Sequence, residues 1–133
     1  MNEPVWVTQE VIVATQVKLL ERFGGLEGIR DEGLLESAVN RPRQIFTYGK
    51  PSIFEMAAAY ATGLVKNHPF LDGNKRIGFM TAYIFLGANG FLLKAPEEEA
   101  VLRTLALAAG AIGEKEYAEW LAVSCKETPC SSS

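Results

Sequence analysis

The chain has 133 residues, of which 48% are hydrophobic and 22% charged, and its formal net charge is −3. These values are typical of one globular domain with its own hydrophobic core, and they exclude a disordered chain. A pI near 5.2 argues against direct binding of nucleic acid, which needs a broad basic face. The most apolar stretch, residues 78–93, contains Thr81 and Asn89 and is too short to span a bilayer. We therefore expect neither nucleic acid nor a membrane as a partner.

The N-terminal residues and the two cysteines near the C-terminal end favour a cytoplasmic protein, which we expect to form one domain. The N-terminus has no basic region followed by an apolar run, so we predict no signal peptide. The two cysteines, Cys125 and Cys130, are too few for a disulfide framework, and with one histidine they make no plausible zinc site. We expect free thiols. The prediction is one domain over residues 1–125, followed by a flexible, Ser-rich tail over residues 126–133.

The first half of the chain predicts two helices. Apolar residues at helical spacing indicate one that begins after Thr8 and ends at Gly24-Gly25. Asp31 is a good N-cap for a second helix, which Pro42 should close because proline inside a helix removes a backbone hydrogen bond. Residues 43–51 then predict an irregular or hairpin-like excursion.

The second half predicts further helices and no lasting sheet. These helices are expected over residues 52–67, from about 72 to 89, from 96 onward and over 114–124. The first of them opens with a capping box, in which the side chains of Ser52 and Glu55 each bind the other's backbone N–H. Two β-prone runs, residues 5–7 and 91–93, are too short to build a sheet on. The predicted fold class is all-α.

The most informative segment is residues 67–78, Asn-His-Pro-Phe-Leu-Asp-Gly-Asn-Lys-Arg-Ile-Gly. It contains His68, the only histidine in the sequence, on which acid–base chemistry near neutral pH would depend. Pro69 should end the preceding helix and push His68 toward an extended backbone, which places its ring on a loop. Taken alone, a single histidine is more often a structural residue than a catalytic one.

Residues 72–76 predict an anion site at the start of the following helix. Asp72, Gly73 and Asn74 form an N-cap region, and glycine there lets the backbone approach a ligand closely. Lys75 and Arg76 then place two cations in the first turn, where the helix dipole disfavours positive charge. The other predicted helices carry glutamates near their starts. We infer a phosphate site here, the alternative being an ordinary cap with solvated cations.

Together these residue types supply what phosphoryl or nucleotidyl transfer needs. His68 is a base for a hydroxyl, Asp72 is a carboxylate for Mg²⁺, and the helix start offers donors to phosphate oxygens. The transition state of such a transfer spreads negative charge over those oxygens. Catalysis therefore depends mainly on positioning and electrostatics.

With these residues the sequence resembles the Fic/Doc family, whose signature is His-x-Phe-x-Asp/Glu-Gly-Asn-Gly-Arg-x-x-Arg. The residues that match it in order and spacing are His68, Phe70, Asp72, Gly73, Asn74 and Arg76. Lys75 stands in place of the second glycine, and Phe79 in place of the last arginine. Asn-Lys-Arg is the usual form in the Doc (death-on-curing) toxins, which residues 28–38 also resemble.

The resemblance implies a compact bundle of about six helices with the motif on a central loop and helix start. It also implies a short flap, expected at residues 43–51, that lays the target beside the motif, the alternative for this segment being a plain surface loop. It makes His68 the general base and Asp72 the ligand of Mg²⁺ on the phosphates of ATP. The remaining motif positions would bind the nucleotide: Gly73 and Asn74 by shaping an anion nest, Lys75 and Arg76 by holding phosphate oxygens.

The two departures decide which reaction the resemblance implies. Bulk and charge at Lys75, and a missing arginine at Phe79, disfavour the AMP transfer of typical Fic enzymes. They favour the Doc reaction, transfer of the γ-phosphate of ATP to a Ser/Thr hydroxyl of the translation machinery, elongation factor Tu in the family pattern. The first alternative is a Fic-type AMP-transferase. The second is a catalytically weak module that binds a repressor-like partner.

The resemblance also implies restraint by a separate chain. Self-inhibited Fic proteins carry Ser/Thr-x-x-x-Glu-Gly/Asn, whose glutamate reaches the last arginine of the motif. Here Glu27-Gly28 follows Phe23 by four residues, and Phe79 replaces the arginine, so we expect no such brake. We therefore expect a toxin with a cognate, Phd-like antitoxin, whose disordered segment folds onto an apolar groove of the bundle.

Overall fold

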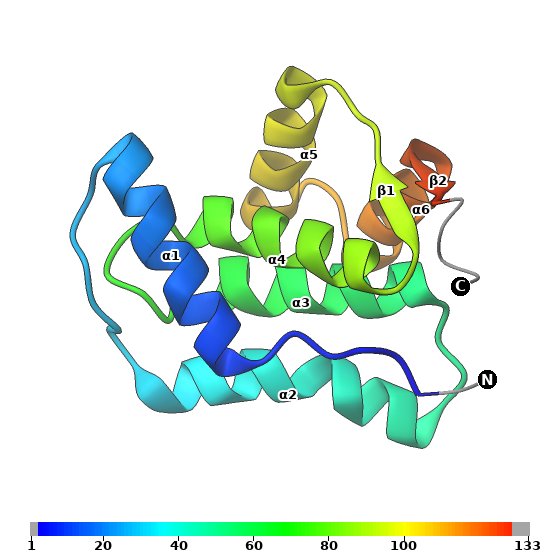
Figure 1. The fold of residues 1–133 in the computed structure, drawn as a ribbon, viewed down its shortest axis with the longest axis horizontal. Helices are drawn as coiled ribbons and strands as arrows, with labels where there is room; N and C mark the ends of the chain where they lie inside the picture. Colours follow the sequence, from blue (N-terminus) through cyan, green and yellow to red (C-terminus); the bar gives the residue numbers. More distant parts are fainter. Residues whose placement is uncertain (1–2, 129–133) are drawn as a thin grey trace.

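The computed structural model describes residues 3–128 and shows, over that range, six helices and two short strands (Figure 1). The helices are α1 (Gln9–Phe23), α2 (Glu32–Tyr48), α3 (Ile53–Asn67), α4 (Asn74–Ala88), α5 (Glu97–Ala109) and α6 (Glu114–Ser124). The strands β1 (Phe91–Leu93) and β2 (Cys125–Glu127) pair antiparallel. None of these helices is long and apolar enough to cross a bilayer. The predicted all-α bundle of about six helices is confirmed.

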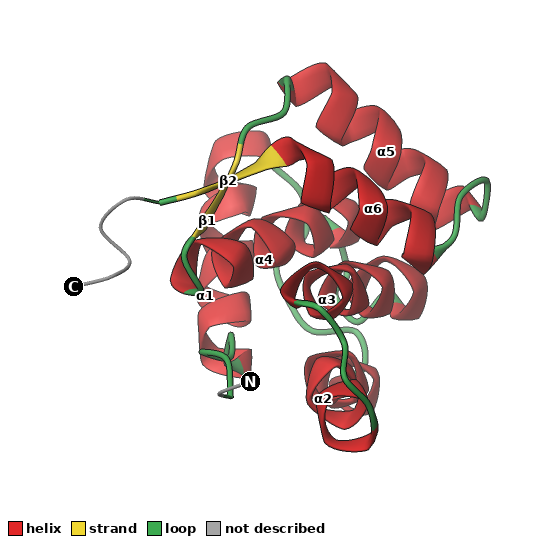
Figure 2. Ribbon diagram, turned by 90° about the vertical axis from the view of Figure 1, so that its right-hand side faces the viewer, coloured by secondary structure: helices red, strands yellow, loops and turns green. Residues whose placement is uncertain are grey.

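Helix α3 lies at the centre of the bundle, with α2, α4 and α6 packed around it (Figure 2). Its residues 56–61 are fully buried. Small residues let the neighbouring helices approach closely. A Cβ on Gly63 would lie 3.0 Å from the Cβ of Ala38 on α2, and one on Gly78 of α4 would lie 2.7 Å from Val65 Cγ1. Because α3 and α4 run side by side, the loop that joins them lies at one end of the bundle.

The predicted helix starts are confirmed by their caps. Thr8 and Asp31 cap α1 and α2, each by accepting the backbone N–H three residues further on. Both halves of the capping box of α3 are formed, at 3.1 Å from Glu55 N–H to Ser52 Oγ and 2.7 Å from Ser52 N–H to Glu55 Oε1. Helix α5 begins directly after Pro96, and α6 covers the predicted residues 114–124.

The predicted end of the second helix is wrong, because α2 continues through Pro42 to Tyr48. Pro42 forgoes one backbone hydrogen bond, but it is buried, and Ile45 and Phe46 pack against the core beyond it. The apolar stripe of α2 therefore extends past the proline, and its burial outweighs the lost bond. Residues 43–48, predicted to be irregular, are the last turns of α2.

The short strands extend the folded domain beyond its predicted end. Phe91–Leu93, predicted to be too short for a sheet, pairs with Cys125–Glu127. Three-residue strands carry little local signal, and tertiary contact decides whether they pair. Lys126 and Glu127 thus belong to the folded domain rather than to the tail predicted from residue 126. Residues 129–133 of that tail lie outside the described residues.

Candidate active site

His68 follows the last residue of α3 and has a left-handed backbone, with φ 50° and ψ 55°. It is the only non-glycine residue with positive φ among residues 3–128. The extended backbone predicted from Pro69 is therefore wrong, because the left-handed turn that ends α3 outweighs the preference of a residue before proline. Such a conformation costs about 1–3 kcal/mol, so surrounding contacts must hold it. The His68 side chain is exposed.

Asn74, the first residue of α4, is 7% exposed and braces the loop with its side-chain amide. The amide oxygen accepts the N–H of Phe70 at 3.0 Å, and the amide nitrogen donates to the Phe70 carbonyl at 3.0 Å. The same nitrogen lies 3.5 Å from His68 Nδ1, the limit of a hydrogen bond. The Phe70 ring is buried. Asn74 thus fixes the loop backbone and lies beside the imidazole. Because its side chain is used in this way, the group that Asn74 can offer to an anion is its backbone N–H.

Asp72 lies two residues before α4 and does not cap it. Its exposed carboxylate accepts the N–H of Leu26 at 3.1 Å, and its backbone carbonyl accepts from Gln16 Nε2 at 3.2 Å. Gly73 takes the N-cap position instead, with a φ of 77° that glycine adopts without strain. Since glycine has no capping side chain, the start of α4 keeps its donors for a ligand.

The start of α4 differs in charge from the other five helix starts within residues 3–128. Each of those has an acidic residue in its first turn, whereas α4 has the exposed cations Lys75 and Arg76. The first intrahelical bond of α4 runs from Ile77 N–H to the Gly73 carbonyl at 2.9 Å. The N–H groups of residues 74–76 therefore have no acceptor within the helix. Together with the helix dipole, these donors and cations make the start of α4 suited to binding an anion.

A cavity of about 790 Å³ opens beside this helix start. Its polar end, at the start of α4, is lined by Gly73, Asn74, Lys75 and Arg76, and Glu97 at the start of α5 also lines the cavity. Its wall is otherwise mostly apolar and includes Leu19 and Phe23 of α1, Phe79, Met80 and Tyr83 of α4, and Val101 and Leu105 of α5. The Arg76 guanidinium carbon lies 4.4 Å from the centre of the Phe23 ring, a cation–π contact. The cavity is suited to a ligand with phosphate at one end and an apolar or aromatic group at the other.

The segment beside the motif is the connection between α1 and α2, not the predicted flap at residues 43–51. Leu71 N–H donates to the Gly28 carbonyl at 3.0 Å, and Arg30 N–H donates to the Pro69 carbonyl at 2.7 Å. This connection and the α3–α4 loop share one end of the bundle (Figure 1). The sequence feature that could have indicated this connection is its set of three glycines. All three have positive φ in the structure: Gly24, Gly25 and Gly28.

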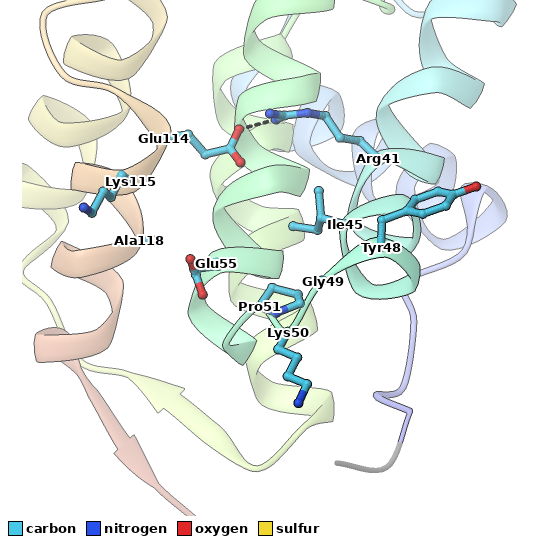
Figure 3. A pocket seen from close by; sticks show the side chains of 10 residues that line it. All are labelled: Arg41, Ile45, Tyr48, Gly49, Lys50, Pro51, Glu55, Glu114, Lys115 and Ala118. Carbon is cyan, nitrogen blue, oxygen red and sulfur yellow. Dashed lines mark hydrogen bonds and ion pairs between the residues drawn. The ribbon is translucent and has the colours of Figure 1, made fainter.

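The predicted flap lies at the opposite end of α3 (Figure 1). Residues 48–51 line a second cavity, of about 670 Å³, together with residues from the starts of α3 and α6 (Figure 3). An ion pair between Arg41 and Glu114 joins α2 to α6 there. Since no residue of the motif lines this cavity, it is not part of the candidate active site.

The residues of the motif fit a Mg²⁺ ion only together with a nucleotide. Within residues 3–128, no three side chains of His, Cys, Asp or Glu gather into a metal site. Asp72 offers a single exposed carboxylate, with one oxygen bound by Leu26 N–H. One carboxylate is sufficient for Mg²⁺ where phosphates and water supply its other ligands. The arrangement does not fit a metal ion held by protein side chains alone.

Comparison with known proteins finds the family that the motif resembles. The model of the Fic/DOC family matches residues 6–86, which include the whole motif. Protein kinase doc of Escherichia phage P1 is 31% identical over 116 residues, which are 86% of this chain and 91% of that protein. Toxin Doc of Mycolicibacterium smegmatis is 45% identical over 76 residues, which are 55% of this chain and 58% of that toxin. The chain therefore belongs to the Fic/DOC family.

Proposed function

We propose that this chain is the toxin of a type II toxin–antitoxin system and transfers the γ-phosphate of ATP to a serine or threonine hydroxyl of a translation factor. The observation that carries the proposal is the start of α4. Three N–H donors and two cations, without a carboxylate in the same turn, directly follow the loop that holds His68. The relative named Protein kinase doc supports it, since that match covers most of both chains.

The proposed reaction assigns one task to each part of the site. The target hydroxyl attacks the γ-phosphorus while the bond from that phosphorus to the β–γ bridging oxygen breaks, and ADP leaves. His68, exposed on its braced loop, takes the hydroxyl proton. Lys75, Arg76 and the N–H groups at the start of α4 stabilise the charge on the phosphate oxygens. Asp72 would hold Mg²⁺, which neutralises part of the phosphate charge when bound.

Lys75 is the residue that favours phosphate transfer over AMP transfer. It lines the polar end of the larger cavity, while Phe79 contributes an apolar surface to the same wall. The lysine ammonium can bind a terminal phosphate as a point charge. The apolar Phe79 offers no donor to the further phosphates that an AMP-transferase must hold. AMP transfer is the alternative reaction, and ATP labelled at the α or the γ position distinguishes it from phosphorylation.

The proposed protein target would bind the surface next to the α3–α4 loop. Leu26 and Leu71 are 66% and 50% exposed and belong to the two segments that pair at this end of the bundle. We propose that an extended segment of the target lies over these side chains and brings its hydroxyl to the imidazole. The reaction would then take place in the cytoplasm, where ATP and translation factors occur together.

The proposed Phd-like antitoxin would bind the apolar part of the larger cavity. Val101 and Leu105 on α5 line it and are 51% and 44% exposed. An amphipathic helix that folds on binding would cover such side chains.

The sequence offers no self-inhibitory segment in place of this partner. Its two Glu-Gly pairs, residues 27–28 and 32–33, follow neither serine nor threonine at the spacing of the self-inhibitory motif. A catalytically weak module that acts only through this partner is the second alternative.

The test uses labelled ATP. The purified chain is incubated with Mg²⁺ and either a bacterial extract or purified elongation factor Tu, once with γ-labelled and once with α-labelled ATP. Label transferred from the γ position only supports the kinase, and label from the α position supports AMP transfer. Label from neither position supports the binding module.

Variants of the motif test the roles of its residues. His68→Ala should lower transfer by at least about 10²-fold, because it removes the general base. Asp72→Ala should lower both turnover and the affinity for Mg²⁺-ATP. Glu36→Ala removes an exposed carboxylate from α2 and serves as a control that should leave transfer unchanged. Wild-type transfer by the His68 or Asp72 variant would show that the assigned role is wrong.

A further inference from the structure

Arg30 uses its side chain to bind the backbone that carries His68. Its Nε donates to the His68 carbonyl at 2.7 Å, and its Nη2 donates to the Asn67 carbonyl at 2.9 Å. Its own backbone N–H donates to the Pro69 carbonyl at 2.7 Å. Within residues 3–128 its guanidinium makes no ion pair. The donors of Arg30 thus serve the end of α3 and the start of the loop.

The end of α3 needs a partner of this kind. The helix ends at Asn67, and the carbonyls of a last helical turn have no N–H of their own helix to accept from. With His68 in the left-handed conformation, its carbonyl and that of Asn67 both lie within reach of one guanidinium. A planar guanidinium can bind two such oxygens with two different nitrogens, whereas the donors of an ammonium all lie on one nitrogen.

We infer that Arg30 is a positioning residue for His68. It holds the left-handed backbone of His68 and, with it, the place of the imidazole beside the anion site. The inference rests on the proposed role of His68 as general base, and Arg30 need not touch ATP or the target. A residue before proline prefers an extended backbone. Removal of the Arg30 side chain should therefore let His68 move toward that conformation.

The backbone of His68 can be observed directly. Because the sequence contains one histidine, ¹³C-labelled histidine in the untagged chain reports on His68 alone by NMR. Arg30→Ala should move the His68 Cα and Cβ shifts from left-handed toward extended values and displace the ring signals. Arg30→Lys keeps the charge without the two-donor fork and should give a smaller change in the same direction. Arg41→Ala removes a guanidinium that is bonded to Glu114 and lines the other cavity, and it should leave the signals unchanged.

The NMR comparison of these variants can contradict the inference. Folded Arg30→Ala and Arg30→Lys proteins that both keep wild-type His68 shifts would overturn the inference. Circular dichroism shows whether each variant is folded. If Arg30→Ala does not fold, Arg30→Lys decides by the same criterion.

Kinetics provide the second readout. Arg30→Ala should lower kcat of the transfer by about tenfold or more and leave KM for ATP within about threefold of wild type, because a misplaced base affects the chemical step. Arg30→Lys should recover part of kcat. A raised KM with unchanged kcat would contradict the inference and place Arg30 in nucleotide binding. If the wild-type chain transfers nothing, the proposed function fails, while the His68 shifts still decide whether Arg30 holds the loop.

Discussion

Lys75 is an exposed cation in the first turn of α4, where a positive charge costs about 0.3–1 kcal/mol unless an anion is bound. A phosphate bound at the helix start, as proposed, would account for its presence there. Lys75→Gly should lower phosphorylation of the target and let AMP transfer appear, because the change removes the charge and makes room for further phosphates. Parallel assays with γ- and α-labelled ATP measure both reactions. A variant that still moves only the γ-phosphate, at an undiminished rate, would refute this role of Lys75.

Cys125 carries a free thiol, as predicted, and burial raises its pKa to about 11. Cys130 lies outside the described residues. Because the thiolate is the reactive form, Cys125 in the Cys130→Ser variant should react with iodoacetamide at pH 8 more than about tenfold more slowly in the folded protein than in urea. Mass spectrometry of timed samples measures the rates. Equal rates in both states would mean that this thiol is not protected by the fold.

At the scale of helices, the approach of α2 to α3 depends on a glycine. A Cβ on Gly63 would lie 3.0 Å from the Cβ and 3.1 Å from the Cα of Ala38, whereas one on Gly87 of α4 would meet nothing within 4 Å. Gly63→Ala should destabilise the fold by about 1–3 kcal/mol through overpacking. Gly87→Ala should stabilise it by up to about 1 kcal/mol, because alanine is the better helix former. Urea unfolding measures both changes, and equal effects would argue against a tight contact at Gly63.

The elements differ in how far the sequence could predict them. The starts of α1, α2 and α3 were predictable because Thr8, Asp31 and Ser52 are local capping signals. The end of α2 was not, since a rule about proline cannot weigh the burial of Pro42 and the residues after it. Arg30 and Gln16, which bind the backbone of the motif from other parts of the chain, were missed for a related reason. Arg30 lies 38 residues from the carbonyl of His68 that it binds, and no local pattern contains such a pair.

For the whole molecule, the proposed function predicts a toxin that depends on a second chain for restraint. Expression of the chain alone in a bacterial host should arrest growth. Co-expression with the gene immediately upstream should relieve the arrest, and so should His68→Ala without any partner. Growth curves of the three strains test this, with Glu36→Ala as a control that should remain toxic. Harmless expression of an active enzyme would contradict the toxin proposal.

The many bonds that other parts of the chain make to the α3–α4 loop have a dynamic consequence. The N–H of Phe70 is held by Asn74 and that of Leu71 by the Gly28 carbonyl, while Gln16 holds the carbonyl of Asp72. Since these bonds must break together before the loop opens, both amides should exchange with deuterium as slowly as those of the surrounding helices. Hydrogen-exchange mass spectrometry tests this, and exchange within seconds would contradict it. The site would then keep one backbone conformation throughout its cycle, with movement confined to exposed side chains and to the ligands themselves.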